Sequence, residues 1–256
     1  MCRYFAYRGE PAPLSKWVFD ASRSLERQAY QPLELVSGTI NVDGTGVGWW
    51  NQGESAPLRY VFDGPPWADP NLSTLAPRIV SGTQVAVVRS ATPGIGHGPG
   101  HLQPFTHDAA GVAVAHNGWV GGFRGPLGQQ MLADLDSDRF AELPAMNDSA
   151  VIFSAIVQQI LGGATTDSAL RTVTEKVLEL GRSHGQAVTL SIAVSDADQI
   201  AAIRTATGVR PNSLYMCARD EGHLLASEPL DDGVWEPTPI DHLVVMTTRG
   251  HHVTPL

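Results

Sequence analysis

A cysteine directly follows the initiator methionine of this 256-residue chain. Removal of Met1 would leave Cys2 with a thiol and a free α-amine on the same residue. The reference pKa of that amine is about 7.7–8.0, close to working pH, so the amine can act as a general base for the thiol. Cys2 would then supply both nucleophile and base for covalent catalysis. A cysteine in second position can also be an ordinary residue, so the prediction depends on the rest of the site.

Three further features would supply the other parts of an acyl-transfer site. The triplet His116-Asn117-Gly118 follows an apolar run, and it offers an Asn amide and a Gly N–H that could stabilise an oxyanion. Arg89 ends another apolar run and could bind a carboxylate through its guanidinium fork. Asp148 begins a helical pattern and could bind an ammonium group. Taken singly, they are also explained by an Asn-Gly turn, a surface Arg and a helix-capping Asp.

The elements that must position these residues alternate in type along the chain. Strand patterns cover the first half, and helical spacing of apolar residues follows over 148–161 and 167–180, with Thr166 or Asp167 as the expected N-cap of the second helix. Strand patterns then return. The order of strands, two helices and strands predicts an α+β domain with two sheets and no separate linker. The predicted strands cover 2–8, 39–50 (a strand pair or a bulged strand), 84–88, 111–115, 188–194, 199–204, 213–218, 223–227 and 243–247.

Composition excludes several other classes of protein. The net charge is -9, with 17 Lys+Arg against 26 Asp+Glu, which argues against a nucleic-acid partner. No apolar run approaches the roughly 18 residues of a membrane span, and the first residues do not resemble a signal peptide. Two cysteines do not make a disulfide framework, so we expect a reducing, cytoplasmic setting.

The ordered motifs resemble the glutaminase domain of the class II glutamine amidotransferases. The resemblance implies a single domain over 2–256 with a four-layer αββα sandwich of the N-terminal-nucleophile (Ntn) hydrolases, in which two mainly antiparallel sheets pack together between helices. It implies Cys2 as nucleophile, Asn117 and Gly118 as the oxyanion hole, and Arg89 and Asp148 on the glutamyl carboxylate and amine. His116 and Thr92 fall in the same substrate-binding motifs. Two departures, Ala150 in place of Glu and Pro93 in place of His, affect the details of the glutamyl pocket. The motifs are MCR at 1–3, DGTGVGWW at 43–50, RSAT at 89–92, HNG at 116–118 and NDSA at 147–150.

A narrower resemblance, to the stand-alone γ-glutamyl amidohydrolases of ergothioneine biosynthesis, extends over nearly the whole chain. Those enzymes remove glutamate from γ-glutamyl-hercynylcysteine sulfoxide, which carries a trimethylammonium group. Aromatic faces bind such cations, and Trp67 and Trp119 are the candidates, although ordinary packing would also explain either residue. The motifs are the 30–50 stretch, PPWADPNL at 65–72, RSATPG at 89–94, QPFTHD at 103–108 and LLASEPLDDG at 224–233.

Two other functions remain open at this stage. The protein could be a glutaminase subunit that delivers ammonia to a separate synthetase, although the chain ends soon after its last predicted strand, which favours a hydrolase. It could instead bind a γ-glutamyl ligand or a partner protein without catalysis. The expected partner is a small γ-glutamyl substrate, with no nucleic acid, no membrane and no metal or organic cofactor, and a homodimer is left open. His97 and His101 are four residues apart but stand in a Gly-Pro loop that does not fix the convergent geometry of a zinc site.

Overall fold

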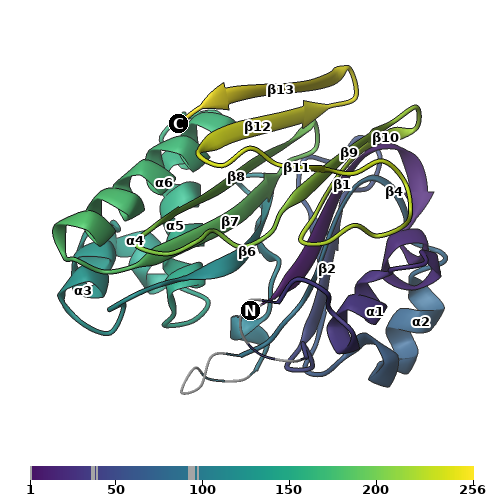
Figure 1. The fold of residues 1–256 in the computed structure, drawn as a ribbon, viewed down its shortest axis with the longest axis horizontal. Coiled ribbons are helices and arrows are strands. Elements are labelled where there is room, and N and C mark those ends of the chain that lie inside the picture. The colour runs from purple at the N-terminus through teal and green to yellow at the C-terminus, as the bar shows by residue number, and fades with distance from the viewer. Residues whose placement is uncertain (1, 36–37, 39, 92–95, 97) are drawn as a thin grey trace.

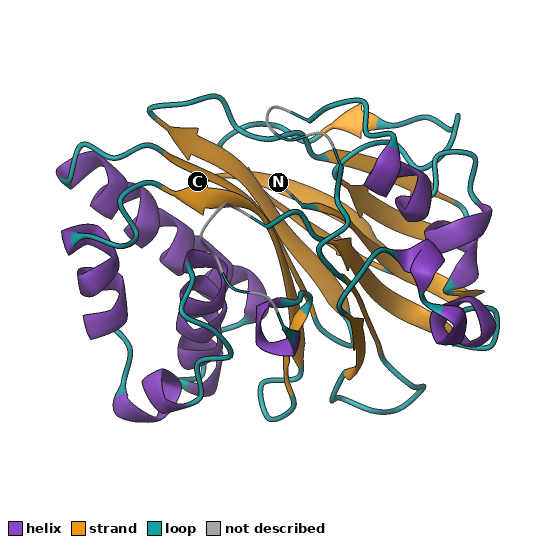
Figure 2. Ribbon diagram, turned by 90° about the horizontal axis from the view of Figure 1, so that it is seen from below, coloured by secondary structure: helices purple, strands orange, loops and turns teal. Residues whose placement is uncertain are grey.

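Two β-sheets pack face to face between two groups of helices in a computed structural model that describes residues 2–35, 38, 40–91, 96 and 98–256. Figure 1 shows α3 to α6 on one side of the sandwich and α1 and α2 on the other, with the sheets between them. Figure 2 shows the same layers from below. The predicted αββα sandwich is confirmed.

The first sheet has β1 near its centre and contains seven strands within the described residues. Its neighbours are antiparallel, and β1 pairs with β4 on one side and β10 on the other. The strand order is β11 (Glu236–Pro237), β9 (Tyr215–Arg219), β10 (Gly222–Ala226), β1 (Arg3–Pro13), β4 (Val80–Val88), β2 (Thr45–Trp49) and β3 (Leu58–Phe62).

The second sheet has six strands in the described part of the chain, and its neighbours are antiparallel. In its middle, β6 pairs with β7 in unbroken register from Ala113↔Ser195 to Val120↔Val188. The strand order is β13 (Gly250–Pro255), β12 (His242–Thr247), β8 (Gln199–Thr207), β7 (Val188–Ser195), β6 (Val112–Val120) and β5 (Phe105–His107).

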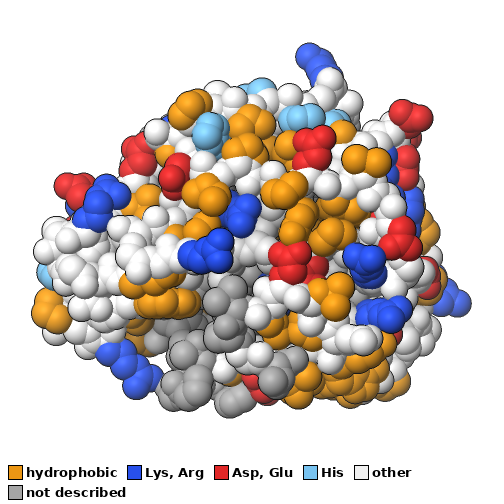
Figure 3. All heavy atoms as spheres, in the orientation of Figure 1, with side chains coloured by type: hydrophobic (Ala, Val, Ile, Leu, Met, Phe, Trp, Pro, Cys, Tyr) orange, Lys and Arg blue, Asp and Glu red, His pale blue; other side chains and the backbone are white. Residues whose placement is uncertain are grey.

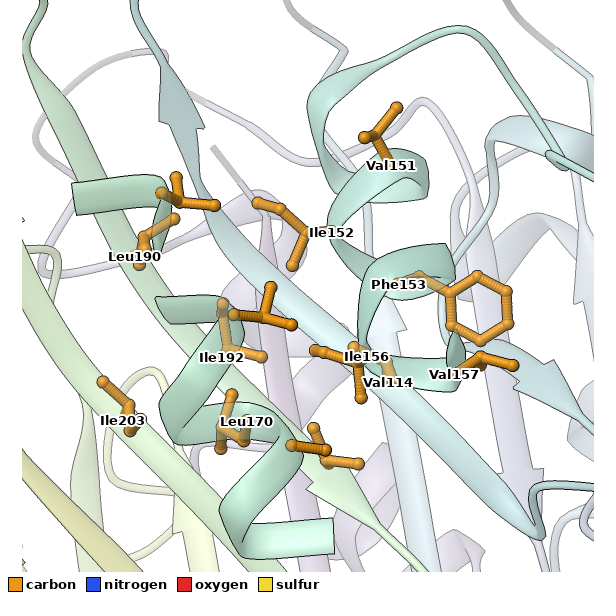
Figure 4. Close-up of a cluster of buried hydrophobic side chains, with 14 of the residues drawn as sticks. Val114, Val151, Ile152, Phe153, Ile156, Val157, Leu170, Leu190, Ile192 and Ile203 are labelled. Atoms are coloured by element: carbon orange, nitrogen blue, oxygen red, sulfur yellow. The ribbon is translucent and has the colours of Figure 1, made fainter. Parts of the chain in front are cut away.

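The helices cover the outer faces of the two sheets. On the second sheet, α5 contributes Ile152 and Ile156 and α6 contributes Leu170 to a core completed by apolar side chains of β6, β7 and β8 (Figure 4). On the first sheet, η1, α1 and α2 cover Phe5 and Tyr7. The helices are η1 (Lys16–Asp20), α1 (Leu25–Tyr30), η2 (Pro66–Ala68), α2 (Pro70–Leu75), η3 (Pro99–His101), α3 (Pro126–Ala133), α4 (Ser137–Ala141), α5 (Asp148–Leu161) and α6 (Thr166–Ser183). No helix in the described ranges is long and apolar enough to cross a membrane.

A third core lies between the sheets, and alanines of β6, β7 and β8 make up much of its second-sheet side. Successive residues of a strand point to opposite faces, so Tyr4 and Ala6 of β1 face inward while Phe5 and Tyr7 face the helices. From the second sheet, Ala115 and Ala193 enter the same inner core. Small side chains allow two sheets to approach closely, which matters because the sheets carry different parts of the site.

Some expected boundaries are corrected by the structure. Helix α6 takes its N-cap from Thr165, whose hydroxyl accepts from Ser168 N, and not from Thr166 or Asp167. Of the described part of the 39–50 stretch, residues 40–50, Thr45–Trp49 alone is strand. The triplet at 116–118 lies inside β6 rather than after it, because pairing with β7 continues to Val120 and overrides the local Asn-Gly turn signal.

Candidate active site

One pocket gathers most of the predicted site residues. Its cavity volume is about 840 Å³, and it is lined by Cys2, Arg89, His116, Gly118 and Asp148. Cys2 directly precedes β1 and Arg89 directly follows β4, whereas His116 and Gly118 lie within β6 and Asp148 begins α5. The fold therefore brings together residues that are far apart in the sequence.

Cys2 is held at the head of β1 by the residue that follows it. Arg3 Nη1 donates to the Cys2 carbonyl oxygen at 3.3 Å, and Arg3 Nε lies 2.9 Å from Glu228 Oε1. Arg3 and Glu228 are both buried, and Glu228 also accepts from the main-chain N–H groups of Leu33 (2.8 Å) and Glu34 (3.0 Å). Burial lowers the pKa of the Arg3 guanidinium, and Glu228 opposes that shift. A guanidinium remains charged in proteins, so the pair is a fixed buried ion pair next to Cys2.

A buried hydroxyl pair joins the two sheets beside Cys2. Tyr4 Oη and Ser191 Oγ lie 3.0 Å apart, and Ser191 is the register partner of Asn117 on β6. Burial raises the pKa of the Tyr4 phenol above its ordinary value, so the phenol stays protonated at neutral pH. This contact fixes the start of β1 relative to the 116–118 triplet.

Asn117 and Gly118 occupy different positions relative to the pocket. Gly118 lines it, whereas the fully buried Asn117 is not among its described lining residues. With its amide oriented to satisfy its neighbours, Asn117 donates to the Cys2 carbonyl oxygen and accepts from Arg3 Nη1, each at 3.2 Å. Its main-chain carbonyl accepts from Asn212 Nδ2 at 3.1 Å. The structure thus places the Asn117 amide against the backbone of Cys2, and its role as an oxyanion donor stays a prediction.

Position 118 requires glycine for steric reasons. A Cβ there would lie 2.0 Å from the carbonyl oxygen of Thr189 and 2.4 Å from Nε2 of His116. Both are closer than any real contact, so the close pairing of β6 with β7 at this point admits only hydrogen. The Gly118 backbone is therefore exposed to the pocket without a covering side chain.

Arg89 follows β4 immediately, as its place at the end of an apolar run predicts. It is buried and lines the pocket. Its Nη2 donates to the Gly96 carbonyl at 2.9 Å and its Nη1 to the Asp43 carbonyl at 3.4 Å. A guanidinium has five N–H donors, so these two contacts orient the group and leave further donors for an anionic ligand.

Asp148 is the first residue of α5, but it is not the helix cap. Asn147 is the cap, and its side-chain oxygen accepts from Ala150 N at 2.9 Å. The Asp148 carboxylate accepts from Val120 N at 2.9 Å and from Ser149 N at 2.7 Å. Asp148 therefore ties α5 to the end of β6, and its carboxylate keeps acceptor capacity toward the pocket because two oxygens offer about four lone-pair sites.

His116 lies in the pocket wall and is anchored by two residues that sequence reasoning missed. Its Nδ1 lies 2.8 Å from Ser149 Oγ, and Gln103 bonds both to its main-chain N–H (2.5 Å) and to its carbonyl (3.1 Å). Burial lowers the pKa of the imidazole, and nearby Asp148 only partly offsets this, so His116 is neutral at pH 7. Both missed residues belong to quoted motifs, QPFTHD and NDSA, and that is the signal that could have identified them.

The remaining predicted contacts divide between pocket and surface. Trp119 lines the pocket and is 37% exposed. Trp67 is not among the described lining residues, and its ring stacks edge-on against Tyr30 of α1 at 5.5 Å between centroids. Hydrophobic side chains gather on the lower right of the face in Figure 3, where Figure 1 places α1 and α2. Thr92 lies outside the described residues.

Within the described ranges, no group of three or more His, Cys, Asp or Glu side chains is placed to hold a metal ion. A half-buried cysteine at the head of a central strand, in a two-sheet sandwich covered by helices on both sides, is the arrangement of the N-terminal-nucleophile amidohydrolases, and this chain is of that class.

Comparison with known proteins places the chain within that class. Residues 30–232 match the family model of class-II glutamine amidotransferases, and the chain belongs to that family. It is 32% identical over 257 residues to a γ-glutamyl-hercynylcysteine sulfoxide hydrolase of Mycolicibacterium smegmatis, covering 100% of both chains. It is 30% identical to the enzyme of the same name from Mycobacterium tuberculosis, covering 100% of this chain and 97% of the relative. A glutamine aminotransferase class-II domain protein from Silicibacter pomeroyi has the same fold, with a TM-score of 0.73 and 23% identity. The match covers 100% of this chain and 99% of that protein.

Proposed function

We propose that this protein is a γ-glutamyl amidohydrolase in which Cys2, exposed by removal of Met1, attacks the γ-carbonyl carbon. The observation that carries the proposal is that one pocket holds Cys2 and Gly118 together with a buried cation, Arg89, and an anion, Asp148. A γ-glutamyl group carries an α-carboxylate and an α-ammonium beside its amide. Arg89 and Asp148 carry the charges opposite to those of these two groups. Cys2 would attack the amide carbon, and the Gly118 N–H would stabilise the oxyanion.

The reaction would run through a thioester. The α-amine of Cys2 takes the thiol proton, and the thiolate adds to the γ-carbonyl carbon. The oxyanion formed is stabilised by the Gly118 N–H and the Asn117 amide, and losing one such donor typically costs about 3–4 kcal/mol of barrier. The intermediate collapses, the C–N bond breaks, and the leaving amine takes the proton from the α-ammonium. Water then adds to the thioester, and glutamate leaves as the thiol is restored.

The full-length relatives support γ-glutamyl-hercynylcysteine sulfoxide as the substrate. The cavity of about 840 Å³ lies within the roughly 300–1,000 Å³ of ligand pockets and leaves room beyond the glutamyl group for a large leaving amine. Trp119 at the pocket wall offers an aromatic face for its trimethylammonium group. We place this reaction in a single domain over 2–256 and in the cytoplasm.

Maturation and nucleophile are tested together. Intact-mass measurement should show loss of Met1, and a γ-glutamyl affinity label should attach to Cys2 only. The matched control is Cys217, a buried thiol on β9. We expect C2A to abolish labelling and turnover and C217A to leave the labelling stoichiometry unchanged. Retained Met1 with full activity, or label on Cys217, would contradict the mechanism.

The substrate class is tested by measuring glutamate release from γ-glutamyl-hercynylcysteine sulfoxide and from glutamine, without any other protein. The proposed hydrolase cleaves the larger amide with the higher kcat/KM. Rapid glutamine hydrolysis that appears only when a synthetase is added would identify an ammonia-delivering subunit instead. Tight binding of γ-glutamyl compounds without turnover would identify a binding protein.

A further inference from the structure

The charged groups of the pocket do not match a lone glutamyl group. Its described lining contains two guanidinium groups, Arg89 and Arg124, but a single carboxylate, that of Asp148. His116, with a pKa lowered by burial, adds no charge at neutral pH. Glutamine presents one carboxylate and one ammonium to this site. A γ-glutamyl amino acid presents two carboxylates and one ammonium, which matches the described lining charge for charge.

The two guanidinium groups lie at different depths. Arg89 is buried at the end of β4, with its donors fixed by the carbonyls of Gly96 and Asp43. Arg124 is exposed and lies in the turn between β6 and α3. The glutamyl group must place its γ-carbonyl at Cys2, so an inner cation suits its own carboxylate. The second, exposed cation of the same lining then suits a group attached beyond the scissile bond.

The turn that carries Arg124 is held by three contacts. Gly125 N donates to the Gly122 carbonyl at 2.8 Å, which puts Phe123 and Arg124 at the two central positions of the turn. The Phe123 side chain packs against the helix-side core. A Cβ on Gly128 would lie 1.6 Å from the Phe123 carbonyl oxygen, so the first turn of α3 presses directly on the turn. Arg124 is therefore presented from an anchored backbone, five residues after Trp119.

We infer that Arg124 binds a carboxylate on the leaving amine, so that the enzyme selects γ-glutamyl amino acids over γ-glutamyl amines. This inference rests on the proposed γ-glutamyl amidohydrolase function. The segment from Trp119 to Arg124, which directly follows the 116–118 triplet, forms the leaving-group side of the pocket. Gly122, Phe123 and Arg124 all line it with Trp119.

The test compares two substrates that differ by one carboxylate, γ-glutamyl-alanine and γ-glutamyl-ethylamide. Both are assayed by glutamate release with the mature enzyme. In the wild type, kcat/KM should favour γ-glutamyl-alanine, and R124Q should lower that preference about tenfold, as expected for losing a charge-assisted hydrogen bond at an exposed site. R124K keeps the charge but not the planar fork, so it should fall between the two. R182Q removes an exposed Arg at the far end of α6 and should match the wild type.

The outcomes separate the inference from the proposed function. A preference that falls in R124Q and recovers partly in R124K supports the inference. Equal kcat/KM for the two substrates in the wild type would overturn it while leaving the hydrolase activity established. An equal loss for both substrates in R124Q would also overturn it, because Arg124 would then act on the glutamyl half. If mature wild-type enzyme cleaves no γ-glutamyl amide, the proposed function itself fails.

Discussion

His116 shows how a single residue can serve the site by staying uncharged. Its imidazole is buried and bonded through Nδ1 to Ser149, and its main chain is clamped by Gln103. A charged imidazole would have to give up its hydration in this wall, which is why burial lowers its pKa despite the nearby Asp148. The residue that connects β6 to α5 beside the nucleophile is therefore sensitive to acid.

This burial predicts a loss of stability at mildly acidic pH. The unfolded chain binds a proton at His116 with an ordinary pKa of about 6.5, whereas the folded protein binds it only at lower pH. The free energy of unfolding should thus be undiminished above pH 6.5 and should decline as pH falls below it. Urea unfolding at several pH values would show this decline, and H116Q should make it shallower. Burial also lowers the pKa of His223, so His223 should add to the decline in the free energy of unfolding as pH falls.

The exposed His184 provides the comparison for that experiment. H184Q should retain the wild-type decline, because it changes an exposed side chain and leaves the buried imidazole of His116 in place. If H116Q shows the same pH dependence as H184Q, the imidazole of His116 is not held neutral by the fold.

At the scale of elements, α5 acts through its first turn. The Asn147 cap fixes where the helix begins and so where Asp148 meets the pocket, and Asn147 Nδ2 also lies 3.1 Å from His101 Nδ1. N147A should lower the free energy of unfolding by about 1 kcal/mol, as caps do, and should also lower kcat/KM. N147D should restore most of both.

The cap of α6 makes the matched control. Thr165 caps that helix in the same way but does not line the pocket in the described residues. T165A should therefore reduce stability to a similar extent while kcat/KM stays at the wild-type value. Chemical denaturation and steady-state kinetics on both variants would show whether the Asn147 cap positions Asp148. Equal kcat/KM for N147A and T165A would mean that it does not.

The long helices and strands could be predicted from the sequence, whereas the short ones could not. Period-2 and helical patterns predicted β1, β7 and the limits of α5 because those segments bury a regular face. Helices of five or six residues such as α1, α2 and α4 carry too little periodicity to be detected. The hairpin strand β13 was missed because it is mostly exposed.

The same limit applies to the site. Arg89 and Asp148 could be placed because each stands at the end or beginning of a predictable element. The bonds from His116 to Gln103 and Ser149 span 13 and 33 positions and exist only after the strands pair. Trp67 was predicted as a substrate contact because it lies in a quoted motif. Nothing local in a sequence shows which way a short surface segment such as η2 faces.

At the scale of the whole molecule, the site depends on the spacing of two sheets. Cys2 and Arg89 belong to the first sheet, and His116 and Gly118 to the second. Between them, Ala115, Ala193 and Ala202 lie side by side on β6, β7 and β8, and all three are fully buried in the inter-sheet core. Larger side chains in that row would push the sheets apart and move Cys2 away from the 116–118 triplet.

Ala193 is the most direct position at which to test this dependence. A193L adds three carbons to a closely packed layer, so it should lower the free energy of unfolding by about 1–3 kcal/mol. It should also lower kcat several-fold, because a displacement of about 1 Å between reacting groups can reduce rates by a large factor. The control is L170M in the outer, helix-side core, where a volume-conserving change should cost less than about 1.5 kcal/mol and leave kcat unchanged. The two variants are compared by urea unfolding and by kcat measured well below their unfolding midpoints. If A193L is destabilised but keeps wild-type kcat, the spacing of the sheets does not set the geometry of the site.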